Sequence, residues 1–109
     1  MEIKATDPFL KSAKPLSKKY KSFNQDYKEL IKDLKKNPEM GVDLGDGFRK
    51  VRMAISSKGK GKSGGARVIT FNTLLKEDKL YLLYIYDKSE HDNILMPVIR
   101  EIAKELALL

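Results

Sequence analysis

Cysteine is absent from this sequence, and histidine occurs once, as His91. Without thiols the chain cannot form disulfides, iron–sulfur clusters or thiolate zinc sites. A single histidine argues against a histidine-rich metal centre and against a Ser-His-Asp triad. We therefore expect neither a metal nor a small-molecule cofactor.

Long apolar runs are also missing. No stretch approaches the roughly 18 consecutive apolar residues of a membrane span, and the N-terminus MEIKATDPF lacks the apolar core of a signal peptide. We expect a cytoplasmic protein with no membrane partner. At 109 residues, with 41% apolar and 34% charged side chains, the chain is expected to fold as one domain over residues 1–109.

Acidic residues are missing from one long stretch, Gly47–Lys76, which carries eight cations. The rest of the chain has 14 cations against 15 acids, so this stretch accounts for the net charge of +7. Two alternating apolar runs within it, joined by a Gly/Lys/Ser loop, predict a hairpin. Segregated positive charge favours a polyanionic partner, most commonly nucleic acid.

Helical periodicity appears before and after this stretch. A short edge strand at Glu2–Ala5 is followed by an expected helix with Asp7 as N-cap, Pro8 in its first turn and Pro15 as a kink or a second start. A second helix ends near Asn37-Pro38, and its core face and capping box are predicted from Ser22, Gln25, Phe23, Tyr27, Leu30, Ile31 and Leu34.

The strands are predicted from alternation. Phe48, Val51, Met53 and Ile55 are core candidates of the first strand, and their spacing suggests a bulge or a strand start near Lys50. Residues 66–73 form the second strand. Residues 80–87, LYLLYIYD, form a central strand covered on both faces. A last helix from about Leu95 is expected to point five residues inward: Val98, Ile99, Ile102, Ala103 and Leu106.

The expected fold class is α+β, with two N-terminal helices packed on a small, mainly antiparallel sheet of three or four strands and a C-terminal helix. Residues 59–64 spell GxGxxG. A strand and not a helix follows, so a dinucleotide site is not expected, and a phosphate-binding P-loop fails for the same reason.

Several side chains are candidates for phosphate chemistry. Lysines and glycines of the loop suit close approach to a phosphate, and Arg67 at the start of the second strand can hold one bidentately. Lys88, Glu90 and His91 follow the third strand and offer acid, base and charge stabilisation.

Three stretches of the chain together resemble the RelE/ParE superfamily of toxins from type II toxin–antitoxin modules. They are GFRKVRMAISSKGKGKSGGARVIT, LYLLYIYDKSE and the helix ending in KKNPEMG. The most similar branch is that of RelE/HigB-type mRNA interferases. The resemblance implies a RelE-like fold and ribosome-dependent, metal-independent cleavage of mRNA, in which the RNA 2′-OH attacks the adjacent phosphate. It also implies two partners: a cognate antitoxin protein and mRNA in the ribosomal A site beside 16S rRNA.

The resemblance further implies residue roles. Arg67 would stabilise the transition state, Lys62 with Lys60 would bind phosphate and act as base, and Lys88 would support the leaving group. Glu90 or His91 is the alternative base. RNA binding would fall to Arg49, Lys50, Arg52 and Lys58.

One departure from the family pattern stands out, because some RelE-type enzymes have a catalytic tyrosine after the last strand and no tyrosine follows Tyr86 here. The apolar C-terminus EIAKELALL suits docking of an antitoxin, although core packing is the simpler interpretation. Two other functions stay open: a ParE-like inhibitor of DNA gyrase, and a non-catalytic RNA- or ribosome-binding module.

Overall fold

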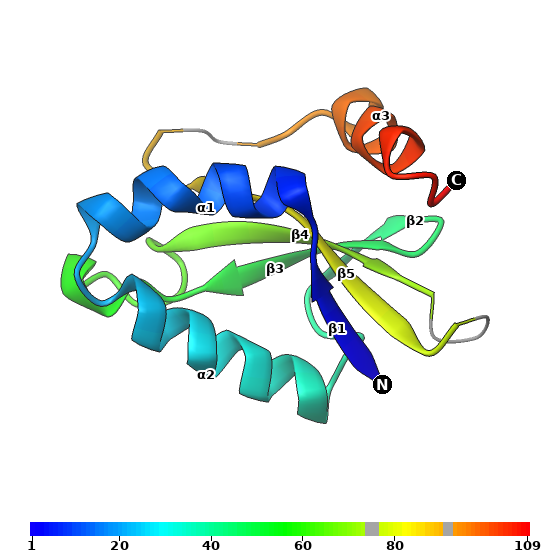
Figure 1. Cartoon of the computed structure of the whole chain (residues 1–109). Coiled ribbons are helices and arrows are strands. Elements are labelled where there is room, and N and C mark those ends of the chain that lie inside the picture. Colours follow the sequence, from blue (N-terminus) through cyan, green and yellow to red (C-terminus); the bar gives the residue numbers. More distant parts are fainter. Residues whose placement is uncertain (74–76, 91–92) are drawn as a thin grey trace.

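A five-stranded sheet separates two helices from a third in the computed structural model of the chain (Figure 1). The structure describes residues 1–73, 77–90 and 93–109. The elements in chain order are β1 (Glu2–Ala5), α1 (Asp7–Lys19), α2 (Phe23–Lys36), β2 (Val42–Gly45), β3 (Phe48–Met53), the 3-10 turn η1 (Ser56–Lys58), β4 (Ala66–Asn72), β5 (Lys79–Asp87) and α3 (Met96–Glu105). None of the helices in these ranges is long and apolar enough to cross a membrane.

The strand order is β1-β5-β4-β3-β2, with β1 parallel to β5 and every other pair antiparallel. This confirms the predicted α+β fold and its mainly antiparallel sheet. The sheet has five strands where three or four were expected. The additional strand is β2, which lies in the stretch predicted as a turn-rich connection. Its hairpin with β3 turns through Asp46 and Gly47, both at positive φ.

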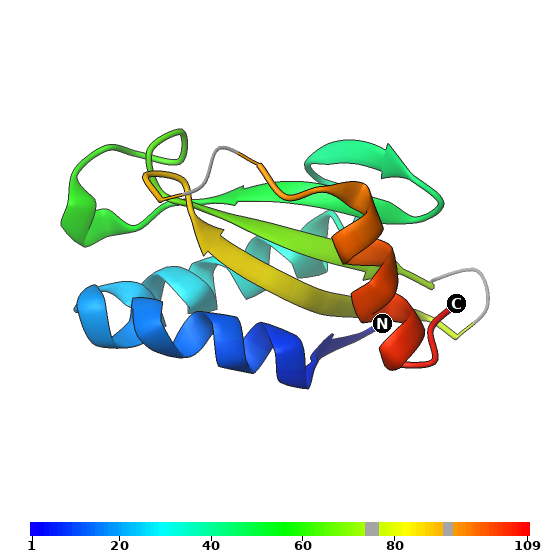
Figure 2. The same ribbon diagram turned by 90° about the horizontal axis from the view of Figure 1, so that it is seen from above.

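Each face of the sheet carries its own apolar cluster, as Figure 2 shows by placing α1 and α2 on one side and α3 on the other. Val51, Met53 and Leu82 pack under α1 and α2. Phe48 and Leu83 pack under α3. The prediction that β5 is covered on both faces is therefore confirmed.

The predicted bulge near Lys50 is wrong, because the β3–β4 ladder is regular from Phe48 to Met53. Phe48 and Val51 are both buried although three positions apart, since side chains alternate between the faces and each face has a core. The irregularities lie elsewhere, between Ile69 and Thr70 against β5 and between Asp43 and Gly45 against β3.

Three helix details also differ from the predictions. Thr6 and not Asp7 is the N-cap of α1, which continues through Pro15. Ser22 and Gln25 form no capping box, because the Ser22 hydroxyl donates to the Asp26 carboxylate at 2.7 Å. Val98 is 47% exposed and not inward, because the contacts of α3 with the sheet centre on Ile99 and Ala103.

Two buried carboxylates fix the loop between β3 and β4 to the helical layer. Asp26 on α2 accepts hydrogen bonds from the backbone N–H and hydroxyl of Ser56, at 2.9 and 2.6 Å. Asp87 at the end of β5 accepts from the Lys58 ammonium at 2.7 Å and from the Tyr20 hydroxyl. Burial alone would raise the pKa of Asp87, but the bonds from Lys58, Tyr20 and Ser89 outweigh it and hold that pKa well below its usual range.

The Lys58–Asp87 pair predicts a large stability effect. Both side chains are almost fully buried, so Lys58→Met leaves a buried carboxylate without its cation and should cost about 3 to 5 kcal/mol. Lys60→Met, at an exposed position of the same loop, should change the free energy of unfolding by less than about 0.5 kcal/mol. Urea unfolding of the two variants measures both values. Equal, small effects would show that the buried pair does not stabilise the fold.

Candidate phosphate-binding site

Four cationic side chains meet at one hollow of about 200 Å³, which is lined by Val42, Lys50, Arg52, Arg67 and Lys88. They come from β3, from β4 and from the residue that follows β5. Lys50 and Arg52 alternate along β3 with Val51 and Met53, which pack under α1 and α2, so the hollow lies on the opposite face of the sheet, the one that also carries α3. We call Lys50, Arg52, Arg67 and Lys88 the cation cluster.

Strand alternation and pairing assemble the cluster. Lys50 and Arg52 are two positions apart on β3 and therefore share a face. Arg52 is paired in register with Arg67 on β4, so these two guanidinium groups extend from opposing positions of neighbouring strands. Lys88 is held close to them because its backbone N–H donates to Gly65 O at 3.1 Å.

Arg67 is the most buried member of the cluster, with 6% of its surface exposed. Its guanidinium donates to the carbonyl oxygens of Lys62, Ser63 and Ala66 at 3.2, 2.9 and 3.1 Å. These bonds fix both the guanidinium plane and the end of the β3–β4 loop. Burial, and then the neighbouring charge of Arg52, lower the pKa of Arg67.

The cluster is suited to an anion because its own charges repel one another. Directly opposed like charges destabilise a sheet, and within the described ranges neither Lys50 nor Arg52 has an ion-pair partner. Arginine binds phosphate oxygens bidentately, whereas lysine is a mobile donor that can also exchange a proton. The site can therefore hold a phosphate diester and stabilise additional negative charge on it.

The loop cations lie outside this cluster. Lys58 is used in the buried pair with Asp87. Lys60 is exposed, and the exposed Lys62 ammonium lies 4.0 Å from Asp33 on α2. The structure thus brings together Arg67 and Lys88 from the predicted catalytic set, and Lys50 and Arg52 from the predicted RNA-binding set.

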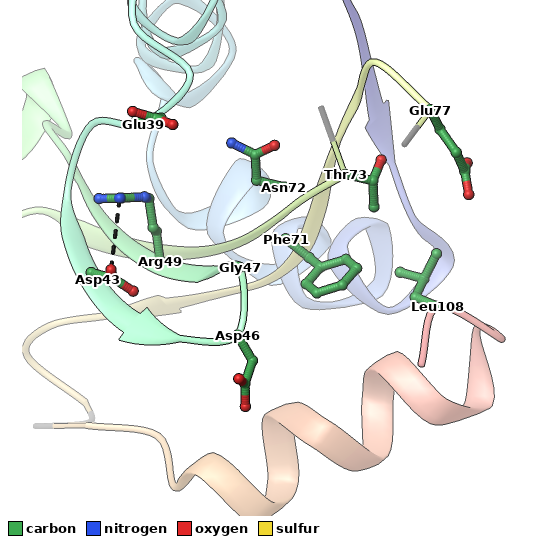
Figure 3. A pocket seen from close by; sticks show the side chains of 10 residues that line it. All are labelled: Glu39, Asp43, Asp46, Gly47, Arg49, Phe71, Asn72, Thr73, Glu77 and Leu108. Carbon is green, nitrogen blue, oxygen red and sulfur yellow. Dashed lines mark ion pairs between the residues drawn. The ribbon is translucent and has the colours of Figure 1, made fainter. Parts of the chain in front are cut away.

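Arg49 lies on the other face of β3 from Lys50 and lines a different hollow of about 570 Å³ (Figure 3). Its guanidinium lies 3.9 Å from Asp43, and the dashed line of Figure 3 marks this pair. Glu39, Asp46 and Glu77 also line that hollow. Its predominantly acidic lining is the wrong charge for a phosphate, so we do not include Arg49 in the candidate site.

Of the three candidates predicted after β5, which are Lys88, Glu90 and His91, only Lys88 lines the hollow. Glu90 is exposed and lies 3.3 Å from the ammonium of Lys19. His91 lies outside the described residues. Two residues not proposed from the sequence adjoin the site: Tyr86, which is paired in register with Arg67, and Asp87, whose buried carboxylate binds Lys58 of the loop from the opposite face. The signal for both was a polar pair ending an otherwise apolar strand.

A family model described as the RelE toxin of the RelE / RelB toxin-antitoxin system matches residues 9–109. The match covers everything from the first turn of α1 to the C-terminus, and with it all four members of the cation cluster.

The cation cluster predicts a specific salt dependence for RNA binding. For a single-stranded oligoribonucleotide, log K should fall with log[salt], and each lost phosphate contact should reduce the slope by about 0.7. Arg52→Gln should show this reduction. Arg100→Gln should not show it, because Arg100 lies on α3, outside the cluster, and is paired with Asp46. Fluorescence anisotropy with a labelled oligonucleotide at several salt concentrations measures the slopes, and equal slopes for both variants would contradict binding at the cluster.

Proposed function

Because this chain belongs to the RelE toxin family of toxin–antitoxin systems, we propose that it is a ribosome-dependent endoribonuclease that inhibits translation by cutting mRNA. The observation that supports this activity is the convergence of Lys50, Arg52, Arg67 and Lys88 on one hollow. The chain would act as a single toxin domain in the cytoplasm, on mRNA in the ribosomal A site, and a cognate antitoxin protein would neutralise it.

The proposed reaction is an internal transesterification of RNA. The 2′-oxygen forms a bond to the adjacent phosphorus while the bond from phosphorus to the 5′-oxygen breaks, which leaves a 2′,3′-cyclic phosphate and a 5′-hydroxyl. One group takes the proton of the 2′-hydroxyl, and another gives a proton to the leaving 5′-oxygen. The phosphoryl oxygens gain negative charge in between, so pre-positioned cations lower the barrier without a metal.

We divide these roles within the cluster by the position and chemistry of each side chain. Arg67 is fixed by three carbonyl oxygens, so it is oriented before the substrate binds, and with Arg52 it would stabilise the crowded phosphate. Guanidinium groups stay protonated in proteins, whereas lysine can lose its proton. Base and acid work therefore fall to Lys50 and Lys88, the two lysines that line the hollow.

The exposed loop cations take a different part in this proposal. Lys60 and Lys62 are exposed residues of the β3–β4 loop, which leads into β4 one residue before Arg67. We assign them to flanking mRNA or to 16S rRNA, where mobile ammonium groups contribute affinity without being positioned for chemistry. Glu90 remains an alternative base through its place after β5.

Two alternative functions make different use of the cation cluster. A non-catalytic RNA-binding module would bind RNA through it, whereas a gyrase inhibitor would need no phosphate-binding site. The hollow lined by four cations supports the first of these alternatives, because such a hollow would bind RNA whether or not it cuts. The nuclease and the non-catalytic binding module differ in what happens to the bound mRNA, which is cut by the first and left intact by the second.

Cleavage is tested by induced expression followed by mapping of new 5′ ends on a reporter mRNA. The chain should arrest growth and produce ends inside translated codons. Lys50→Gln, Lys88→Gln and Arg67→Lys should each reduce cleavage by roughly 10²- to 10³-fold, as expected for loss of a general base or acid in the two lysine variants and of a transition-state donor in Arg67→Lys. Lys28→Gln, at an exposed position of α2 outside the cluster and the loop, is the matched control and should keep cleavage within a few-fold of the parent. Growth arrest without any new 5′ ends would contradict the nuclease and favour the binding module.

A further inference from the structure

A second hollow lies beside the cation cluster on the same face of the sheet. It measures about 210 Å³ and is lined by Tyr84, Tyr86, Asn93, Ile94 and Val98. Pockets for drug-sized ligands have roughly 300 to 1,000 Å³, so this one admits a single ring system and little more. Its lining is aromatic and aliphatic, with one amide side chain.

Strand pairing places this hollow next to the cluster. Tyr86 is paired with Arg67 and Tyr84 with Ile69, whose partner on β3 is Lys50. Side chains at paired positions share a face, and neighbouring strands are about 5 Å apart. One row across the sheet therefore runs Arg52, Arg67, Tyr86 and continues from two guanidinium groups into the aromatic hollow.

We propose that this hollow, which we call the base pocket, holds a nucleobase of the RNA whose phosphate lies in the cation cluster. The inference rests on the proposed function, because it takes the cluster to bind an RNA phosphate. In a nucleotide the sugar separates phosphate and base by a short, fixed link, so a base must lie close to the bound phosphate. The base pocket is a hollow of suitable chemistry at that position.

The side chains match the chemistry of a base. Tyr84 is half-buried and offers an aromatic face for stacking, which is the usual way that proteins hold unpaired RNA bases. Val98 is 47% exposed at the start of α3, where it would cover the opposite side of a bound ring. The exposure that contradicted its predicted core position has a use here.

Asn93 gives the base pocket a means of discrimination. Its Oδ1 accepts a hydrogen bond from Ile94 N at 3.0 Å, so Nδ2 is the group that we expect to donate to a ligand. An amide N–H recognises acceptor atoms on the edge of a base. A preference among the four bases at one position beside the cut would follow.

The test compares ligands with and without a base. The probes are inorganic phosphate, ribose 5-phosphate and the four nucleoside 3′-monophosphates, titrated into the full chain by calorimetry. At least one nucleotide should bind roughly 5- to 150-fold more tightly than ribose 5-phosphate, the range for stacking of one base. Tyr84→Ala should abolish this advantage, and Tyr84→Phe should keep it because the ring remains.

Two further variants guard against a folding artefact. Val98→Gln changes an exposed residue and should lower the same advantage without altering the unfolding midpoint. Tyr81→Ala is the matched control, since Tyr81 lies on β5 away from the base pocket and its hydroxyl contacts Glu77. It should leave the nucleotide preference intact.

The outcomes separate this inference from the proposed function. Equal affinity for nucleotides and ribose 5-phosphate, both weakened by Arg52→Gln, would overturn the base pocket and leave the cation cluster in place. A base-dependent affinity that Tyr84→Ala removes and Arg52→Gln does not change would support the pocket but contradict the phosphate site. Unchanged nucleotide binding with weakened antitoxin binding in Tyr84→Ala would overturn the inference and make the hollow a protein contact.

Discussion

The candidate site depends on two arginines that face each other across neighbouring strands. Arg52 and Arg67 occupy paired positions of β3 and β4, where like charges destabilise a sheet. The arrangement persists because Arg67 is fixed by carbonyl oxygens of Lys62, Ser63 and Ala66. A buried cation that the fold orients, and that has no ion-pair partner among the residues the structure describes, is the arrangement expected of a site built for an anion.

The rest of the structure supports that pair from the opposite face. Asp26 and Asp87 fix the β3–β4 loop to the helical layer through Ser56 and Lys58. The loop in turn supplies two of the carbonyl oxygens that hold Arg67, and Gly65 O holds the backbone of Lys88. The two carboxylates therefore act on the cation cluster through the loop, without contacting a substrate. The acidic hollow lined by Glu39, Asp46 and Glu77 leaves the surface charge unevenly distributed, and in general such a distribution directs polyanions toward the positive region.

The sequence was sufficient for the fold class, for the strand covered on both faces and for the basic stretch, because these depend on periodicity and composition. It was not sufficient for the site. Strict alternation puts Lys50 and Arg52 on one face of β3. Because Phe48 and Val51 were expected to share one core, a bulge was predicted instead, and the common face of Lys50 and Arg52 was not recognised. Lys58 could not be separated from Lys60 and Lys62, since its partner Asp87 is 29 positions away. The exposure of Val98 depends on how α3 crosses the sheet, which no local pattern encodes.

The most direct test of the central claim is the free energy of unfolding of Arg52→Gln, measured with and without inorganic phosphate. If Arg52 is held against repulsion in order to bind an anion, the variant should be more stable than the parent by about 0.2 to 1 kcal/mol without phosphate. The parent should gain stability as phosphate is added, and the variant should gain much less. A variant that is less stable than the parent, with an equal response to phosphate, would show that Arg52 is a structural residue and that the anion site lies elsewhere.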